Sequence, residues 1–284
     1  MAVREPDQLE CLLGKTSHRH DIWLWLFLKQ YGKADFELST CNGRTMRDTL
    51  ANFLETEKAP SLQVIFEATD RFLVEDESVG WIADDERQTR WLAPKIKEMT
   101  QLGEIWDVPR LKGKDLLLGA IDLWEVSISV KNTALRNLSN DWGRHIRKDA
   151  HLKWFEDTKE GADRRKFAWE WIQKDKQLTW FRTPCFSSHT DLLIFFDSAD
   201  LREREIKEIS QSVRRSWNRQ RYLEKLEGKK KQYNFILSME TIELLDELAK
   251  TNGLKRPQIL ERLIIAEAEQ GTYLPQKVSS TGRT

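Results

Sequence analysis

The residues with the clearest chemistry are basic side chains near the C-terminal end of the chain. Between Gln211 and Gln232, eight Lys and Arg residues are opposed only by Glu224 and Glu227, whereas the whole chain has a formal net charge of zero. Because the overall charge supplies no attraction, affinity for nucleic acid must come from such clusters. We therefore expect phosphate contacts from this stretch, and a solvated charged helix is the alternative. The expected phosphate ligands are Arg214, Arg215, Arg219, Arg221, Lys229, Lys230 and Lys231.

Elsewhere, the sequence offers no convincing motif for catalysis or for a metal. His18 to His20 lacks a cysteine or acid at ligand spacing. Gly14 to Thr16 is similar to the end of a phosphate-binding loop, but Leu9 stands where the first glycine is required. The acidic residues between Glu75 and Glu86 lack the glycine-centred pattern of a calcium loop. We predict that the protein is not an enzyme, with no catalytic residue, no metal and no cofactor.

The composition is that of a globular protein, with 32% charged and 39% hydrophobic residues. The three cysteines, Cys11, Cys41 and Cys185, are scattered and odd in number, which suits a reducing cytoplasm. No stretch approaches the roughly 20 apolar residues of a membrane span. The N-terminus is charged and lacks a signal-peptide pattern. We predict a cytoplasmic protein without a membrane partner.

A strand and two helices are expected directly after the basic run. Residues 232–237 alternate so that Tyr233, Phe235 and Leu237 share one face, which is typical of a half-buried strand. Ser238 can cap a first helix, and Pro257 can open a second. Such a unit is too small to fold alone, so a two-fold homodimer is expected. Its shared core would contain Tyr233, Phe235, Leu237, Leu245, Leu248, Ile259 and Leu263.

These residues resemble a known family. Gln232 to Phe235 resembles the start of the strand, and Asn252 to Lys255 the inter-helix turn, of ribbon-helix-helix proteins of the Arc, CopG and MetJ type. The resemblance implies that paired strands enter the major groove of double-stranded, palindromic DNA, with Gln232, Asn234 and Ile236 reading bases. It also implies phosphate binding where the second helix opens, at Lys255 and Arg256. Ile236 departs from the usual polar residue, and the family's hydroxyl cap is absent before Pro257.

A basic helix that leads into such a module also resembles, more loosely, the MatP family of terminus-macrodomain organisers. The matching residues are Ile209 to Arg215 and Lys229 to Lys231. This likeness implies that helix and ribbon both contact the DNA site. It adds a chromosome-organising factor associated with the nucleoid to the expected roles, beside a transcriptional regulator such as a repressor.

Periodic apolar residues predict helices over 18–31, 45–57, 62–74, 89–100 and 166–176. A further, polar helix is predicted from 201 to about 226 and includes the start of the basic run. An apolar helical pattern covers Asp115 to Leu138. Leu192 to Phe196 reads either as a buried strand or as a hinge. Twelve tryptophans are more consistent with helix packing than with stacking on bases.

The predicted fold is mainly α. A tryptophan-rich helical N-terminal domain (1–110) and a helical middle domain (111–200) precede a basic helix (201–228), a ribbon-helix-helix module (229–271) and a tail (272–284). The predicted function is dimeric, sequence-specific binding of double-stranded DNA. The alternative is an effector or adaptor whose N-terminal region binds a protein partner or carries an activity, and whose C-terminal module dimerises or directs it to DNA.

Overall fold

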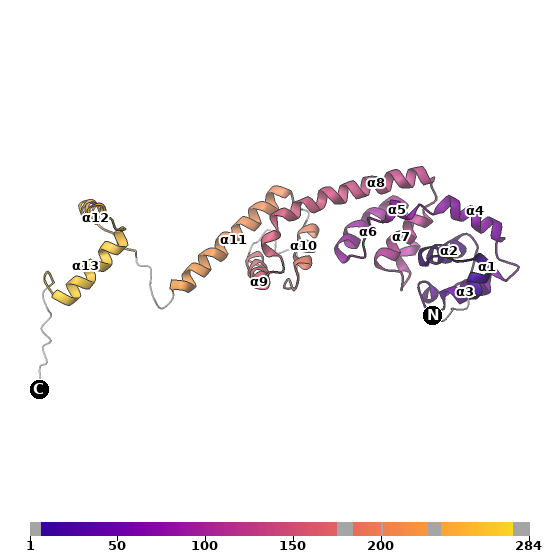
Figure 1. The fold of residues 1–284 in the computed structure, drawn as a ribbon, viewed down its shortest axis with the longest axis horizontal. Coiled ribbons are helices and arrows are strands. Elements are labelled where there is room, and N and C mark those ends of the chain that lie inside the picture. Colours follow the sequence, from indigo (N-terminus) through magenta and orange to yellow (C-terminus); the bar gives the residue numbers. More distant parts are fainter. Residues whose placement is uncertain (1–6, 175–183, 200, 227–233, 275–284) are drawn as a thin grey trace, which may run out of the picture. The chain divides into compact units, whose positions relative to one another are not determined.

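The computed structural model describes residues 7–174, 184–199, 201–226 and 234–274, which are mainly helical and form two compact units, 1–220 and 221–284 (Figure 1). The first unit contains α1 (Gln8–Leu13), α2 (His18–Gln30), α3 (Met46–Leu54), α4 (Leu62–Phe72), α5 (Asp76–Val79), α6 (Glu86–Thr100), α7 (Gly113–Leu123), α8 (Ile128–His145), α9 (Gly161–Ile172) and α10 (His189–Ser198). Helix α11 (Glu203–Leu226) extends into the second unit, which also holds α12 (Met239–Asn252) and α13 (Arg256–Gln270). Short 3-10 helices are η1 (Leu38–Thr40), η2 (Glu104–Asp107), η3 (Ile146–His151) and η4 (Lys153–Phe155).

Helix α2 is the centre of the first apolar core. Its residues Trp23, Trp25 and Leu28 are all 0% exposed. A helix that is apolar all round is stable only when it is surrounded by protein, and α2 packs against both α3 and α7. Gly119 of α7 makes the second contact close, because a Cβ there would lie 3.0 Å from a methyl group of Leu26. The prediction that tryptophans serve packing is thus confirmed at Trp23 and Trp25.

A second apolar core of the same unit joins η4, α9, α10 and the first half of α11. Its buried side chains include Phe155, Ile172, Leu192, Phe195 and Val213. The ambiguous run at residues 192–196 therefore belongs to a helix, α10. Ser188 starts that helix by accepting a hydrogen bond from the Asp191 N–H (3.1 Å), and Asp191 accepts one from the Ser188 N–H (3.0 Å).

The expected helices of the first unit are present, but the helix expected at 166–176 is α9 at Gly161–Ile172, and one expected helix is divided in two. The pattern between Asp115 and Leu138 is divided between α7 and α8. Ser127 accepts a hydrogen bond from the Val130 N–H and so caps a new helix. The apolar spacing continues across this break because both helices face the same core. None of the helices in the described residues has the length and apolar character needed to span a membrane.

The predicted β-ribbon is wrong. Residues 234–238 form no strand, and no strand occurs anywhere in the described part of the chain, although its mainly helical character is confirmed. Alternating side chains describe a half-buried face, but a strand also requires a second strand beside it, and no strand that could pair with residues 234–238 occurs among the described residues. The beginning of the expected strand, Gln232 and Tyr233, lies outside the described residues.

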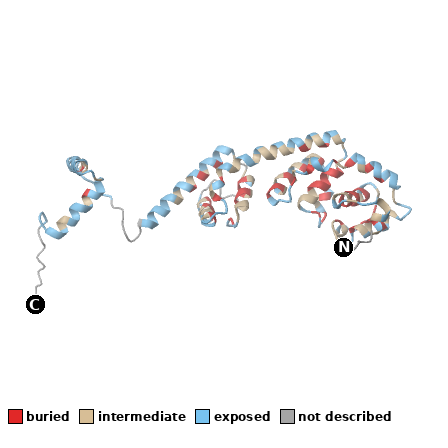
Figure 2. Ribbon diagram, in the orientation of Figure 1, coloured by how far each residue is buried: buried red, intermediate tan, exposed pale blue. Residues whose placement is uncertain are grey.

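Beyond the end of α11, the described residues of the second unit form the two expected helices, α12 and α13. Leu245 of α12 and Ile259 of α13 are buried, whereas Phe235, Leu248 and Leu263 are 68%, 42% and 51% exposed. Figure 2 shows the contrast between this mostly exposed unit and the two cores of the first unit. Of the six described residues that were expected in a shared core, Leu245 and Ile259 are thus buried within the single chain; the seventh, Tyr233, lies outside the described residues.

A buried lysine links three helices of the first core. Lys131 of α8 is 0% exposed, and its Nζ donates to the backbone oxygens of Phe72 (2.5 Å) and Asp122 (2.8 Å). These carbonyls lie at the C-terminal ends of α4 and α7, where backbone oxygens lack helical partners. The Asp122 carboxylate is bound by Arg19 of α2 at 2.6 and 2.8 Å. Burial lowers the pKa of Lys131 to about 8.

We predict that Lys131→Ala lowers the free energy of unfolding by about 2–5 kcal/mol, because it leaves a cavity and two carbonyls without donors. Lys131→Met keeps most of the volume, so a smaller loss is expected. The unfolded chain retains its proton up to pH 10.5, while the folded chain releases it near pH 8. The stability of the wild type relative to Lys131→Met should therefore rise with pH across this interval. Urea unfolding at several pH values measures it, and a constant difference would contradict the assignment.

Candidate nucleic-acid interface

One face of α11 is basic and exposed along almost the whole helix. Positions separated by four and three residues in turn fall on one side of an α-helix. On α11 these positions are all exposed and carry either a positive charge or an amide: Lys207, Gln211, Arg214, Asn218, Arg221 and Lys225. The neighbouring face, with Ile206 and Val213, is buried in the second core. The packing of the apolar face thus determines where the basic face points.

The N-terminal half of this face forms one wall of a groove of about 430 Å³. The opposite wall comes from η3, η4 and the residues around them. The lining consists of Ala150, His151, Lys153, Trp154, Lys207, Ser210, Gln211 and Arg214. None of these residues is acidic. The groove therefore presents cations and hydrogen-bond donors, which suits a phosphate group.

Hydrogen bonds and ring contacts hold this groove in shape. Ser210 Oγ donates to the backbone oxygen of His151 (2.8 Å), which joins α11 to η3. The Trp154 ring lies near two guanidinium groups, with the Arg164 and Arg214 carbons 4.9 and 6.0 Å from its centre. Trp217 contacts the same ring edge-on at 6.2 Å. Cation–π contacts of this kind orient an arginine without neutralising its charge, so Arg214 keeps its full charge at the groove.

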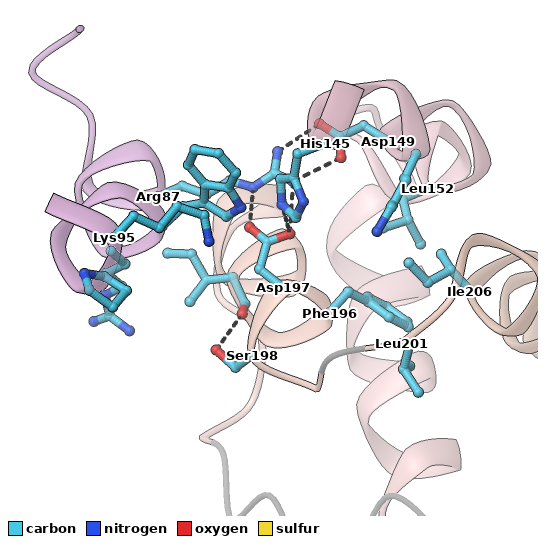
Figure 3. Close-up of a pocket in the computed structure, with 15 residues that line it drawn as sticks. Arg87, Lys95, His145, Asp149, Leu152, Phe196, Asp197, Ser198, Leu201 and Ile206 are labelled. Carbon is cyan, nitrogen blue, oxygen red and sulfur yellow. Dashed lines mark hydrogen bonds and ion pairs between the residues drawn. The ribbon is translucent and has the colours of Figure 1, made fainter. Parts of the chain in front are cut away.

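A buried ion cluster connects α6 to the elements around the groove (Figure 3). Arg87 of α6 binds Asp149 of η3 at 2.6 and 2.8 Å and Asp197 of α10 at 2.6 and 3.0 Å. His145 Nε2 lies 2.8 Å from Asp197, and its ring stacks on Trp142. Burial alone would raise the pKa of Asp197, but the hydrogen bonds from His145 and Arg87 hold this pKa below its usual value.

The predicted phosphate ligands lie in different surroundings. Arg214 and Arg221 lie on the basic face of α11, where Arg221 forms an ion pair with Glu224 (3.6 Å), while Arg215 and Arg219 are exposed beside this face. Lys229, Lys230 and Lys231 lie outside the described residues. At the start of α13 the Lys255 N–H donates to Gln258 Oε1 (2.9 Å). Arg256 forms an exposed ion pair with Asp246 of α12, so its charge already has a partner.

The predicted base-reading residues are not brought into a common surface by a ribbon. Asn234 and Ile236 are exposed in a segment without strand structure, and Gln232 lies outside the described residues. Leu237, expected in the dimer core, is 38% exposed. Among the described residues, no group of three or more His, Cys, Asp or Glu side chains is arranged to hold a metal ion.

Of the eight groove residues, only Arg214 was predicted from the sequence; His151, Lys153, Trp154 and Lys207 are among the seven that were not. Lys153 and Lys207 are far apart in the chain and meet only because η4 and α11 share a core. One signal was present, namely the spacing of seven residues between Lys207 and Arg214, which places both on one helix face.

Comparisons with family models, curated proteins and solved structures gave no match to this chain.

We predict that Arg87→Ala lowers the free energy of unfolding by about 3–5 kcal/mol, because two partly buried carboxylates lose their shared cation. The exposed Arg90, which pairs with Glu86 one helical turn away, is the matched control, and Arg90→Ala should cost less than about 1 kcal/mol. The lowered pKa of Asp197 means that its contribution is present above its ordinary value of 3.8 and is lost in more acidic solution. Chemical denaturation should show the wild-type advantage shrinking below that pH. Equal losses for the two variants would refute the structural role of the cluster.

Proposed function

We propose that this protein binds duplex DNA as a homodimer, with the basic face of α11 lying along the phosphate backbone. The observation that carries the proposal is the exposed face from Lys207 to Lys225, whose six positions are cations and amides. One of these cations, Arg221, lies 3.6 Å from the Glu224 carboxylate. Its length is about 27 Å at 1.5 Å per residue. Duplex DNA carries one charge per roughly 1.7 Å of its axis, so a face of this length spans many phosphates.

The groove beside Trp154 supports the same function. Its cations come from two directions, with Lys153 on one wall and Lys207 and Arg214 on the other. A phosphate between these walls receives charge-assisted hydrogen bonds from both sides, which are stronger than contacts with neutral donors. The amides of Gln211 and Asn218 add donors that contact phosphate oxygens without selecting a base.

The homodimer is proposed to form through the second unit. Leu244, Leu263, Ile264 and Ile265 are between 51% and 65% exposed, although all are apolar. Two helices with so many exposed apolar side chains gain stability by covering them. A second copy of α12 and α13 offers the same surface, and a two-fold arrangement covers both copies at once.

This proposal differs from the sequence-based expectation in one respect. Base reading by Gln232, Asn234 and Ile236 depended on a paired ribbon and is not carried forward. The proposed role remains that of a transcriptional regulator or a DNA-organising protein, associated with the nucleoid. The α11 face accounts for affinity, because phosphate contacts position a protein on DNA without specifying sequence.

We predict that Lys207→Ala combined with Arg214→Ala weakens DNA binding and flattens its salt dependence. Each lost phosphate contact reduces the slope of log affinity against log salt by about 0.9, so a dimer that loses four contacts should lose roughly 3–4 units. The control is Lys58→Ala with Lys112→Ala, which changes two exposed lysines on the helices and loops around the first core. Fluorescence anisotropy with one duplex over a salt series measures the slopes. An unchanged slope in the α11 variant would rule out this face as the DNA contact.

We predict that Leu263→Glu weakens dimerisation while each chain stays folded, because Leu263 is already 51% exposed in the single chain. A charge at a dimer interface should weaken association by at least about tenfold, or roughly 1.4 kcal/mol. Arg262→Glu changes an exposed polar residue of the same helix and is the matched control. Sedimentation equilibrium distinguishes the species. A monomeric wild-type protein at micromolar concentration would overturn the dimer proposal.

A further inference from the structure

A polar cavity of about 280 Å³ lies between α5 and α8 of the first unit and shares no lining residue with the groove beside Trp154. This volume is just below the usual range of drug-sized sites, so it suits a smaller molecule. The cavity is lined by Ser78, Trp81, Asn132, Arg136, Ser139 and Asn140. None of these residues is acidic, and five of them carry a hydroxyl, an amide or a guanidinium group.

The packing of α8 brings its polar residues to this cavity. Lys131 and Leu135 of α8 are buried, and the same helix packs against α5. Asn132, Arg136 and Asn140 follow one another at intervals of four residues, which places them on one side of an α-helix. This polar side lies next to the buried one, so the packing that buries Leu135 also fixes the position of Arg136 at the rim of the core.

The opposite wall is formed by α5 and the turn after it. The Trp81 indole N–H donates to the backbone oxygen of Ser78 (3.2 Å), which holds the turn closed. The Ser78 hydroxyl takes no part in this bond and has no hydrogen-bond partner among the described residues. It is therefore available to a ligand in the cavity.

The polar side chains of the α8 wall are also available. Within the described part of the chain, Arg136 has no carboxylate within ion-pair distance, and the side chains of Ser139 and Asn140 form no hydrogen bond. The guanidinium presents parallel N–H groups that match the two oxygens of a carboxylate. Arg136 is the only charged residue of the lining, so the cavity favours a ligand with a single negative charge.

Asn132 indicates that the ligand also carries hydroxyl groups. Its Oδ1 atom is buried and has no hydrogen-bond partner among the described residues, which is a costly arrangement for an acceptor. Because Asn132 lines the cavity, a rotation of its amide allows a ligand hydroxyl to donate to this oxygen. The side chains of Ser139 and Asn140 can both donate and accept, so they suit further hydroxyl groups.

We propose that this cavity binds a hydroxylated monocarboxylate of monosaccharide size, of the hexuronate type. Its carboxylate binds Arg136, and its hydroxyls bind the serine and asparagine side chains. One cation balances the single charge of a carboxylate, whereas a phosphate group carries between about 1.5 and 2 negative charges at neutral pH. The site lies outside the proposed DNA-binding surface and does not depend on it.

The test is isothermal titration calorimetry of the full chain with glucuronate, galacturonate and gluconate, and separately with glucose, acetate and inorganic phosphate. At least one hydroxylated carboxylate should bind about tenfold more tightly than glucose, acetate or phosphate. Arg136→Gln should weaken that binding by at least about tenfold. Arg136→Lys, which keeps the charge but loses the parallel N–H groups, should weaken it less.

The matched control is Arg144→Gln, which changes an exposed arginine of the same helix that does not line the cavity and should leave binding unchanged. Arg136 is itself exposed, so its variants are expected to fold, and circular dichroism checks this. Three results would overturn the site. These are no binding of any hydroxylated carboxylate at about 10 mM, equal binding of glucose, acetate or phosphate, or undiminished binding by the folded Arg136→Gln variant.

Discussion

The first unit depends on the shared ion pairs of Arg87. This guanidinium is almost fully buried, and a buried cation is stable only when nearby acceptors compensate for its lost hydration. Asp149 and Asp197 meet that need from η3 and α10, which belong to the second core, whereas Arg87 belongs to α6. The charges of Arg87, Asp149 and Asp197 are thus neutralised only when the two cores pack together. The position of η3, and with it one wall of the groove beside Trp154, follows from this electrostatic requirement.

Local periodicity was sufficient to predict single helices. The apolar residues of α2 and the polar spacing of α11 gave the correct helix in each case, because both patterns reflect neighbours within one or two turns. Periodicity failed where a capping side chain decides the structure. Ser127 divides α7 from α8 inside a continuous apolar pattern, and Ser188 with Asp191 makes a helix of a run that also suited a strand.

The sites were harder to predict because they are made by contacts between distant residues. Arg214 was expected to bind phosphate from its charge alone, but its neighbours Lys153 and Trp154 come from another element. Arg256 was expected to bind phosphate as well, yet Asp246 already occupies its guanidinium. The sequence shows both arginines in basic surroundings. Only the packing of α12 against α13, and of α11 against η4, distinguishes a charge that has a partner from one that remains available.

The same distinction explains how a chain with no net charge can offer a basic surface. In the first core, acids and bases are joined in pairs, such as Asp122 with Arg19 and Asp21 with Arg47. These pairs cancel at short range and contribute little to the potential outside the protein. The face of α11 from Lys207 to Asn218 contains no acid, so its charge is not cancelled locally. The charge that this protein presents at its surface therefore depends on which charges the fold pairs, and the formal total is a poor guide to it.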